Sequence, residues 1–493
     1  MHEHLEGNHG PAHLTPEQFR ACAHDLVDLI LDYHANISTW PVRADVQPGD
    51  VLSALPEHPP AMPGGEDEWG RIFDDVRSII FPGLTHWQSP GFFGYFPANG
   101  SWPAVLGDLL STGLGVQGML WQTGPAMTEL ETRMLDWMAR LSGLPERFLS
   151  SGPGGGVIQG TASEATLVAM VAARHRLRVG QPQIDPRTLV AYTSTQAHSS
   201  VLKATRIAGI EHLRLVPTDA RHALDPDALG RLIERDVANG LVPFYCCATA
   251  GTTGSGAFDP IDQIANIRNS MAPHAWLHVD AAWAGSAAVC PEHRGFLEGV
   301  EQADSYCTNP HKWLLTNFDC DLFYVADRAM LIDALSVTPE YLRNAASDSG
   351  AVIDYRDWQA PLGRRFRALK LWFVVRHYGR AGLQAHIRQH IAWARWFEDR
   401  VLSDPRFELA APRSLSLVCL RLAGDRDADT RALLEAANAS GQVLLTHTSL
   451  PDAQGRDRYT IRVAIGGTGN TFQSVQQLWG VLASLADADT GVR

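Results

Sequence analysis

Lysine is nearly absent from this chain of 493 residues. Only three of its 41 basic residues are lysines, at Lys203, Lys312 and Lys370, and all the others are arginines. Arginine stays protonated in proteins, whereas lysine can lose its proton and act as an amine nucleophile. Any chemistry that needs a deprotonated amine therefore has three candidates.

Long apolar runs, a basic excess and paired cysteines are also lacking. No stretch approaches the roughly 18 apolar residues that span a bilayer, and no basic-then-apolar leader opens the chain, so we expect neither a membrane partner nor a secretion signal. The net charge of −13 argues against nucleic acid and anionic membranes. None of the seven cysteines forms a C-x-x-C pair, which predicts reduced thiols in a cytoplasmic protein and no metal site.

The middle of the chain alternates short apolar runs with helical periodicity, which predicts an α/β fold with a mostly parallel sheet. The predicted strands are 188–193, 212–216, 242–249 and 276–281, and the predicted helices are 198–209, 226–239 and 260–271. Ligands of such sheets bind beyond the carboxyl ends of the strands. We therefore expect the site at the carboxyl ends of these strands.

The flanking regions differ from this pattern. A helix is predicted from Pro16 with Thr15 as its cap, and the proline-rich passage 41–63 is expected to be an extended arm rather than a packed element. An amphipathic stretch, 364–378, should stop at Gly379. Strands 415–422, 443–448 and 459–465 with helices 430–439 and 471–486 predict a small α+β domain. We divide the chain into an N-terminal helical arm (1–100), a large cofactor-binding domain (101–380) and a small C-terminal domain (381–493).

Two strand exits carry residues suited to amine chemistry. Lys312 lies in Asn-Pro-His-Lys-Trp, just past a predicted strand, and could be a surface lysine or an amine that forms a Schiff base. Asp280 ends an apolar strand and could cap a turn or pair with a buried cation. A pyridine nitrogen beside such a carboxylate stays protonated, and the protonated ring then accepts electrons.

Three other segments complete the set. Gly154–Gly156 and Gly160 lead into Thr161-x-x-Glu164, which predicts a capping box at a helix start where backbone N–H groups attract phosphate. His198 directly follows a strand and could stack on a flat ring or cap the next helix. Thr253 lies in another hydroxyl-rich strand exit. A phosphate nest, a stacking histidine, a hydroxyl, a carboxylate and an amine are together the requirements of pyridoxal phosphate.

At this point the chain resembles the group II pyridoxal-phosphate decarboxylases, and among them the aromatic-L-amino-acid decarboxylases. The resemblance runs from about residue 14 to about residue 480 and is carried by long motifs. These are 85–90, 92–97, 128–131, 156–164, 198–200, 278–282, 309–315, 318–320 and 361–367.

The resemblance implies a fold and a set of cofactor contacts. The fold is the type I, aspartate-aminotransferase-like one, in a homodimer whose N-terminal segments wrap the partner and whose active sites lie at the interface. Lys312 should hold pyridoxal phosphate covalently, Asp280 should pair with the ring nitrogen and His198 should stack on the ring. The other implied cofactor contacts are Ala162, Ser163, Thr253, Ala282, Asn309 and His311.

The implied activity is that of a carboxy-lyase. It converts aromatic L-amino acids (tryptophan, DOPA, 5-hydroxytryptophan, phenylalanine or tyrosine) to arylalkylamines and CO2. Tyr341, in a polar segment expected to act as a lid (333–350), should return a proton to Cα. Relatives that make aromatic aldehydes replace this tyrosine with Phe or the stacking histidine with Asn. Tyr341 and His198 are both present, which favours simple decarboxylation.

A largely aromatic set of residues is expected to hold the substrate. It consists of Trp87, Tyr95, Phe96, Pro97 and Phe318, with Trp102 as a less certain member. Gly363, where histidine- and plant tyrosine-preferring relatives have Ser, leaves room for a catechol or an indole. Ala98 replaces a Thr of animal relatives, and Gln117 and Met119 replace apolar or aromatic residues. A buried Gln117 could hydrogen-bond a ring hydroxyl or an indole N–H.

Other activities remain open from the residues alone. An aromatic acetaldehyde synthase or an aminotransferase would use the same cofactor, and an aminotransferase usually grips the substrate α-carboxylate with an arginine. A glutamate decarboxylase would need cationic groups for the side-chain carboxylate, which the aromatic set disfavours. A binding protein that keeps the fold without the cofactor would lack the absorbance of a lysine-bound cofactor.

Overall fold

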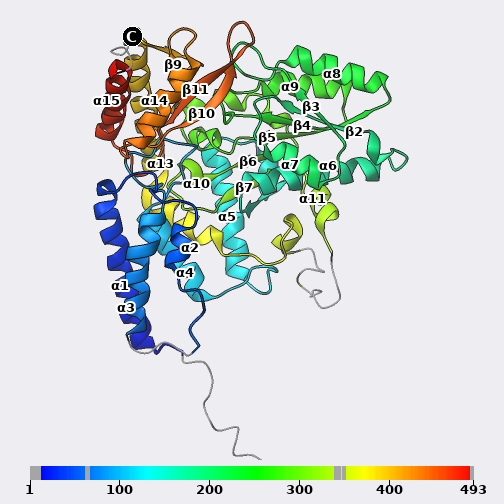
Figure 1. Ribbon diagram of the computed structural model, residues 1–493. Helices are drawn as coiled ribbons and strands as arrows, with labels where there is room; N and C mark the ends of the chain where they lie inside the picture. The colour runs from blue at the N-terminus through cyan, green and yellow to red at the C-terminus, as the bar shows by residue number, and fades with distance from the viewer. Residues whose placement is uncertain (1–12, 62–66, 338–345, 347–350, 489–493) are drawn as a thin grey trace, which may run out of the picture.

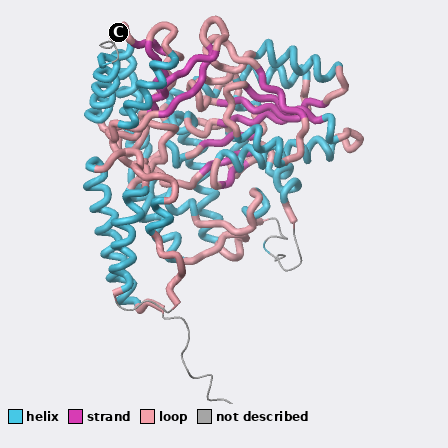
Figure 2. Tube along the Cα trace, viewed as in Figure 1, coloured by secondary structure: helices cyan, strands magenta, loops and turns pink. Residues whose placement is uncertain are grey.

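Two sheets, surrounded by helices, organise the chain (Figure 1). The computed structural model describes residues 13–61, 67–337, 346 and 351–488. Figure 2 shows the strands of the larger sheet gathered in the centre of the molecule, with helices around them.

The larger sheet has seven strands in the order β1-β7-β6-β5-β4-β2-β3. The strands are β1 (Gly155–Gln159), β2 (Leu189–Ser194), β3 (His212–Val216), β4 (Val242–Thr249), β5 (Trp276–Asp280), β6 (Ser305–Thr308) and β7 (Asp321–Val325). Only β7 runs against the others, because it pairs antiparallel with both β1 and β6. The predicted α/β class with a mostly parallel sheet is confirmed.

Burial on both faces explains why these strands are continuous apolar runs. Every residue of β1, β2, β5, β6 and β7 is buried, as expected for a sheet covered by crossover helices. The helices that follow strands are α6 (Ala162–Gly180), α7 (Ser200–Ile207), α8 (Pro226–Ala238), α9 (Ile261–Met271) and α11 (Arg328–Leu335). Each predicted strand and helix of this region ends within two residues of its observed bound.

The N-terminal region contains α1 (Pro16–Asn36), α2 (Asp50–Ala54) and α3 (Glu68–Asp75). The predicted start of α1 is confirmed: the Thr15 hydroxyl accepts a bond from the Gln18 N–H at 3.2 Å. The expectation of an unpacked arm from residue 41 is wrong at its beginning. Val42 is buried against Phe92 and Leu444, and its N–H donates to the Gly441 carbonyl at 2.9 Å.

Three further helices pack together: α13 (Arg367–Ser403) contacts α4 (Trp102–Leu114), α5 (Pro125–Ser142) and the small-sheet strands, and α5 contacts β1. The predicted stop at Gly379 is a kink, because Gly379 leaves the helical conformation with φ 61° and ψ 179° and a second helical stretch follows directly. A positive φ of this kind suits glycine. The sequence prediction missed the second stretch.

The small sheet is antiparallel in the order β10-β11-β9-β8. Its elements are β8 (Phe407–Leu409), β9 (Leu417–Leu422), α14 (Asp427–Ala439), β10 (Thr446–Pro451), β11 (Asp457–Ala464) and α15 (Phe472–Ala488). The α+β prediction for this region holds, but β10 begins three residues later than predicted. Leu444 instead exchanges backbone hydrogen bonds with Gly91 and Phe93. The domain boundaries at residues 100 and 380 remain a prediction.

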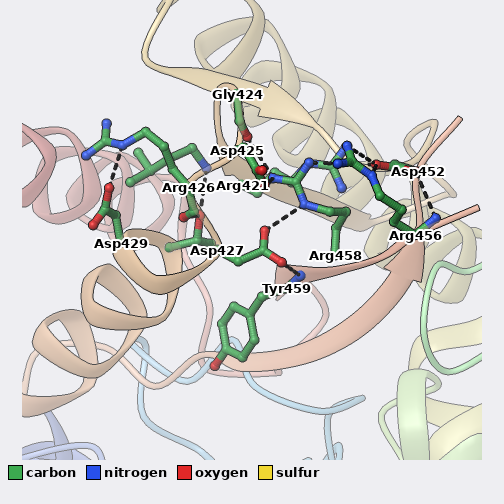
Figure 3. A network of polar contacts seen from close by, with 12 residues as sticks. Arg421, Gly424, Asp425, Arg426, Asp427, Asp429, Asp452, Arg456, Arg458 and Tyr459 are labelled. Atoms are coloured by element: carbon green, nitrogen blue, oxygen red, sulfur yellow. Dashed lines mark hydrogen bonds and ion pairs between the residues drawn. The ribbon is translucent and has the colours of Figure 1, made fainter. Parts of the chain in front are cut away.

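A polar network fixes the start of β11 against α14 (Figure 3). The Arg458 guanidinium donates to Asp427 Oδ1 at 2.8 Å and to the Gly424 carbonyl at 2.7 Å. The Tyr459 N–H donates to the other oxygen of Asp427 at 3.0 Å. Asp427 also lies in the first turn of α14, where a negative charge is favourable. The network therefore orients the strand that carries Arg462 toward the large domain.

Within the described part of the chain, no helix combines the length and the apolar character needed to cross a bilayer.

The buried Lys370 gives a test of how α4 and α13 are joined. Its Nζ lies 3.1 Å from Asp108 Oδ2, which also accepts a bond from Asn317 Nδ2 at 2.6 Å. Asp108→Ala would leave the Lys370 ammonium buried without its partner and should cost about 3 kcal/mol of unfolding free energy. Denaturant unfolding measures this loss.

The matched control is Asp74→Ala, which removes an exposed ion pair with Arg77 and should cost less than about 1 kcal/mol. Equal effects of the two substitutions would contradict the assigned role of the Lys370 pair.

Candidate functional site

A cavity lies beyond the carboxyl ends of β4, β5 and β6, where the sequence placed the site. All nine residues predicted to contact the cofactor line it, together with two of the predicted substrate residues. The lining residues are Phe96, Thr161, Ala162, Ser163, His198, Thr249, Gly251, Thr253, Asp280, Ala282, Trp283, Asn309, His311, Lys312 and Phe318. The alternation of strands and helices is what brings these distant segments to one edge.

Lys312 lies on α10 (Pro310–Trp313), the short helical turn that follows β6. Its Nζ is 5.7 Å from the centroid of the Phe96 ring. Burial lowers the pKa of the Lys312 amine below its usual value; the Asp280 carboxylate opposes this shift, and the Arg462 guanidinium adds to it. The environment therefore shifts Lys312 toward the neutral amine, which is the nucleophilic form. By contrast, Lys203 is exposed and Lys370 is used in an ion pair.

Asp280 is the last residue of β5 and is buried. Its Oδ1 accepts a hydrogen bond from the Ala282 N–H at 3.0 Å, so the turn-capping role considered for this residue is also present. Since Ala282 lines the cavity as well, this bond fixes both residues at its floor. The carboxylate is placed to pair with a cationic ligand atom.

The start of α6 forms one wall of the cavity, but not as the predicted capping box. The Thr161 side chain makes no capping hydrogen bond to the helix, whereas Glu164 Oε2 accepts from the Gly160 N–H at 3.2 Å. The Thr161 hydroxyl therefore remains available at the cavity wall beside Ser163. A helix N-terminus with hydroxyl side chains suits an anion such as phosphate.

Two further polar atoms indicate a ligand. Thr249 Oγ1 and Asn309 Oδ1 belong to cavity-lining residues and are buried without a hydrogen-bond partner in the described structure. Buried polar atoms are nearly always hydrogen-bonded in native proteins. An amide such as that of Asn309 can present either its oxygen or its NH2 group after a flip. With Lys312 for an aldehyde, Asp280 for a ring nitrogen and α6 for a phosphate, the cavity fits pyridoxal phosphate.

Two histidines of the cavity have lowered pKa values. Burial lowers the pKa of His198, whose Nδ1 accepts a bond from the Ser200 N–H at 3.1 Å, so this residue also caps α7. Because Nδ1 is an acceptor, the neutral ring carries its proton on Nε2. Burial lowers the pKa of His311 to about 3 and the Lys312 ammonium contributes. Both rings are therefore neutral near pH 7.

An aromatic stack supports the part of the cavity wall that Phe96 and Trp283 form. Phe96 lies parallel to Trp283 with centroids 4.3 Å apart and an interplanar angle of 13°. Trp283 stacks in turn on Trp313 at 5.3 Å. Trp313 follows Lys312 directly, so the stack connects the substrate-side residue Phe96 to the lysine turn. Such contacts each contribute about 0.5–1.5 kcal/mol beyond burial.

The remaining predicted substrate residues lie outside this cavity. Ala98 and Trp102 line a neighbouring cavity, which shares Phe318 with the first. Trp87 stacks on Tyr95 at 5.6 Å, and both rings are exposed, with 37% and 55% of their surface accessible. Pro97 is buried.

Gln117, Met119 and Gly363 form a separate group that lines neither cavity. Gln117 Oε1 accepts a hydrogen bond from the Met119 N–H at 2.6 Å, and Gln117 Nε2 lies 3.7 Å from the position of a Cβ on Gly363. The expectation of a buried Gln117 amide is wrong for the single chain, because this side chain is exposed and its oxygen is already bonded. Tyr341 lies outside the described residues.

Sequence reasoning missed several residues of the site. Trp283 follows the predicted Ala282 directly, and Thr249 and Gly251 belong to the strand exit 249–254, of which only Thr253 was named as a cofactor contact. Arg462 on β11 had no signal, since it comes from the small domain, far along the chain. Its guanidinium carbon lies 5.1 Å from the Phe96 centroid, and its buried Nη2 has no hydrogen-bond partner in the described structure.

Metal chemistry receives no support from the described residues, where no three His, Cys, Asp or Glu side chains are grouped to hold an ion.

Known proteins that resemble this chain include enzymes that use the cofactor this cavity fits. Residues 48–423 match the family model of the pyridoxal-dependent decarboxylase conserved domain. The chain is 47% identical to phenylacetaldehyde synthase of Arabidopsis thaliana (95% of this chain, 96% of the relative) and 45% identical to tryptophan decarboxylase 2 of Oryza sativa subsp. japonica (97% and 96%). The crystal structure of Oryza sativa TDC with PLP and tryptamine superposes with a TM-score of 0.92 at 41% identity, covering 96% of this chain and 99% of that one. The chain therefore belongs to the family of pyridoxal-dependent decarboxylases.

Proposed function

We propose that this chain uses pyridoxal phosphate to decarboxylate aromatic L-amino acids to arylalkylamines. The observation that carries the proposal is one cavity in which Lys312 and Asp280 lie close to the aromatic rings of Phe96 and Phe318. The relatives support it, because a tryptophan decarboxylase and the structure of TDC with PLP and tryptamine match over nearly the whole chain.

In this proposal the cofactor is held by the residues that line the cavity. Lys312 Nζ binds its aldehyde carbon, and the Asp280 carboxylate keeps a proton on its ring nitrogen. Thr161, Ser163 and the first backbone N–H groups of α6 hold its phosphate, with Asn309 as a further polar contact. His198 and Ala282 cover the two ring faces. When bound, pyridoxal phosphate supplies an electron-accepting ring for the electron pair of the broken bond.

The protein selects which bond breaks by orienting the substrate. The bond from Cα to the carboxylate must stand perpendicular to the cofactor ring, so the walls must hold the carboxylate there. The rigid Phe96–Trp283 stack supplies a flat wall for an aromatic side chain. The neutral His198 and His311 rings keep additional positive charge out of the cavity near pH 7. Tyr341 then delivers its hydroxyl proton to Cα.

An aromatic acetaldehyde synthase is the second candidate, because phenylacetaldehyde synthase is among the relatives at 47% identity. That reaction converts the amino acid, O2 and water to aldehyde, CO2, ammonia and hydrogen peroxide. A panel of aromatic amino acids assayed for CO2, amine, ammonia and peroxide distinguishes the two. Equal amounts of CO2 and amine support the proposal, and peroxide with ammonia in place of amine contradicts it.

The active enzyme in this proposal is a homodimer. Helices α1 and α4 lie near each other (Figure 1), and their His34 and Trp102 rings meet at 4.8 Å. Both helices expose apolar side chains. The exposed residues of this apolar surface are Phe19, Leu26, Val27, Leu31, Leu106, Leu109, Leu110 and Leu114. A patch of this kind marks an interaction surface, and a second copy of the chain is the occupant we propose. Gln117 and Met119, which follow α4 directly, would then reach the site of the partner.

A cytoplasmic location completes the proposal. All seven cysteines are free thiols, and six of them are buried, which suits a reducing compartment.

Replacing the lysine tests the cofactor site. Lys312→Ala should lose the visible absorbance of the lysine-bound cofactor and reduce amine formation below detection, because no other amine lies at the cavity. Absorbance and product assays measure these two effects. Lys203→Ala, which removes the exposed lysine of α7, is the matched control and should keep both. Retained absorbance in Lys312→Ala would rule out this lysine as the attachment point.

Removing the loop hydroxyl tests the protonation step. Tyr341→Phe should slow amine formation by about 10²–10⁴-fold, the usual contribution of a general acid, and should increase aldehyde, ammonia and peroxide. Product analysis under air, compared with the remote Tyr459→Phe variant, measures the change. Unaltered amine production would exclude Tyr341 as the proton donor.

A charge on the apolar surface tests the dimer. Leu110→Glu should convert the dimer to a monomer, since a carboxylate would be buried without a partner at the interface. Sedimentation measures the mass, and Leu402→Glu, at another exposed leucine, should leave it unchanged. A wild-type monomer with full activity would contradict the proposed assembly.

A further inference from the structure

Asp321 is a buried acid that the proposed mechanism does not use. It is the first residue of β7, and because β7 runs antiparallel to β6, Asp321 lies at the same sheet edge as Asp280 and Thr308. Its side chain has no exposed surface, and neither of its oxygens has a hydrogen-bond partner in the described structure. An ionised carboxylate in that position would be strongly destabilised.

The residue opposite Asp321 has a buried amide oxygen that can act as an acceptor. Gln159 on β1 is the direct cross-strand partner of Asp321, and directly opposed residues of an antiparallel pair have their side chains on one face. The Gln159 Nε2 donates to the Trp358 carbonyl at 3.2 Å, which fixes the direction of the amide. Its Oε1 is buried without a partner. Buried, unpaired acceptor oxygens therefore occur on two cross-strand neighbours, and a proton shared between the two side chains would satisfy both.

The surrounding charges favour a neutral Asp321. Asp280 on β5 and Glu164 on α6 raise its pKa in addition to the large effect of burial, while the Lys312 ammonium on α10 opposes them. The other titratable groups nearby are Tyr306 and Cys307 on β6, which are buried and have raised pKa values. Two carboxylates therefore oppose the single lysine near this acid.

We propose that Asp321 carries a proton in the folded enzyme and donates it in a hydrogen bond to Gln159 Oε1. It is then a positioning residue, acting through its neighbours. Gln159 directly precedes the turn into α6, so the bond holds the phosphate-binding end of the cavity. As a neutral acid, Asp321 also leaves the charge of Asp280 free to face the cofactor nitrogen. This role rests on the proposed function, whereas the proton on Asp321 does not.

Infrared spectroscopy of the holoenzyme tests the proton directly. A protonated carboxylic acid absorbs apart from a carboxylate and shifts on exchange into D2O. The difference spectrum of wild type minus Asp321→Asn at pH 7 should contain the protonated band. Asp399→Asn makes the same side-chain replacement at an exposed acid and should show only a carboxylate difference. A carboxylate difference for Asp321→Asn would overturn the proposal.

The pH dependence of stability gives a second test. In the unfolded chain Asp321 ionises near pH 4, but in the folded protein it stays protonated, so wild-type stability falls as pH rises through this window. The unfolding constant of wild type relative to Asp321→Asn should therefore rise by about tenfold per pH unit between about pH 5 and pH 7. Denaturant unfolding measures this ratio, and Asp399→Asn should show no such slope. A flat ratio would contradict the proton assignment.

Cofactor affinity separates this inference from the activity. At pH 7, Asp321→Asn replaces one neutral donor by another, so pyridoxal phosphate should half-saturate its apoenzyme within about twofold of the wild-type concentration. A loss of tenfold or more would indicate that Asp321 is an anion paired with Lys312, and would overturn the proposal.

Failure of the enzyme to release CO2 from any aromatic amino acid would contradict the proposed function. The infrared, stability and cofactor-affinity measurements would still test the proton on Asp321.

Discussion

A lysine amine kept out of water beside a carboxylate is the interaction on which the rest of this structure depends. Lys312 must be buried enough to lose its proton, yet Asp280 must stay near enough to stabilise a cationic ligand. These demands conflict in a uniform environment, because burial disfavours both charges. The parallel sheet allows both, because several buried strands end on the same side of the sheet. A short turn after each strand places its polar group just outside the apolar core.

The elements around Lys312 keep its turn in place at the end of the sheet. The antiparallel β7 lies in the sheet between β6 and β1 and carries Asp321, while the Phe96–Trp283–Trp313 stack packs beside Lys312. Neither element contributes the reacting amine. Their effect is to keep water and loose side chains away from Lys312, and this is what gives the local charges their weight. The small domain adds Arg462 from β11, which lowers the Lys312 pKa further.

The strands were predictable because they depend on local patterns, and strand exits together with the family resemblance pointed to the residues that line the cavity. Continuous apolar runs marked β4 and β5, and each ended in a residue that lines the cavity. The capping box at Thr161 was wrong, since a hydroxyl at a helix start can serve either the helix or a ligand and the sequence pattern is the same for both. The position of β10 was wrong because Leu444 pairs with a segment some 350 residues earlier, a long-range contact without a local signal. Arg462 was missed for the same reason.

The residues proposed to bind the cofactor are separate from the group formed by Gln117, Met119 and Gly363. This separation gives a reason why relatives with different named activities can share this fold. The proposed cofactor contacts all line one cavity at the carboxyl-terminal end of the sheet, whereas Gln117, Met119 and Gly363 lie together outside it. A change in the outer group leaves the buried charges around Lys312 untouched. Substrate preference can therefore change without disturbing the energetics of cofactor binding, which is consistent with a phenylacetaldehyde synthase and a tryptophan decarboxylase each matching about 95% or more of this chain at similar identity.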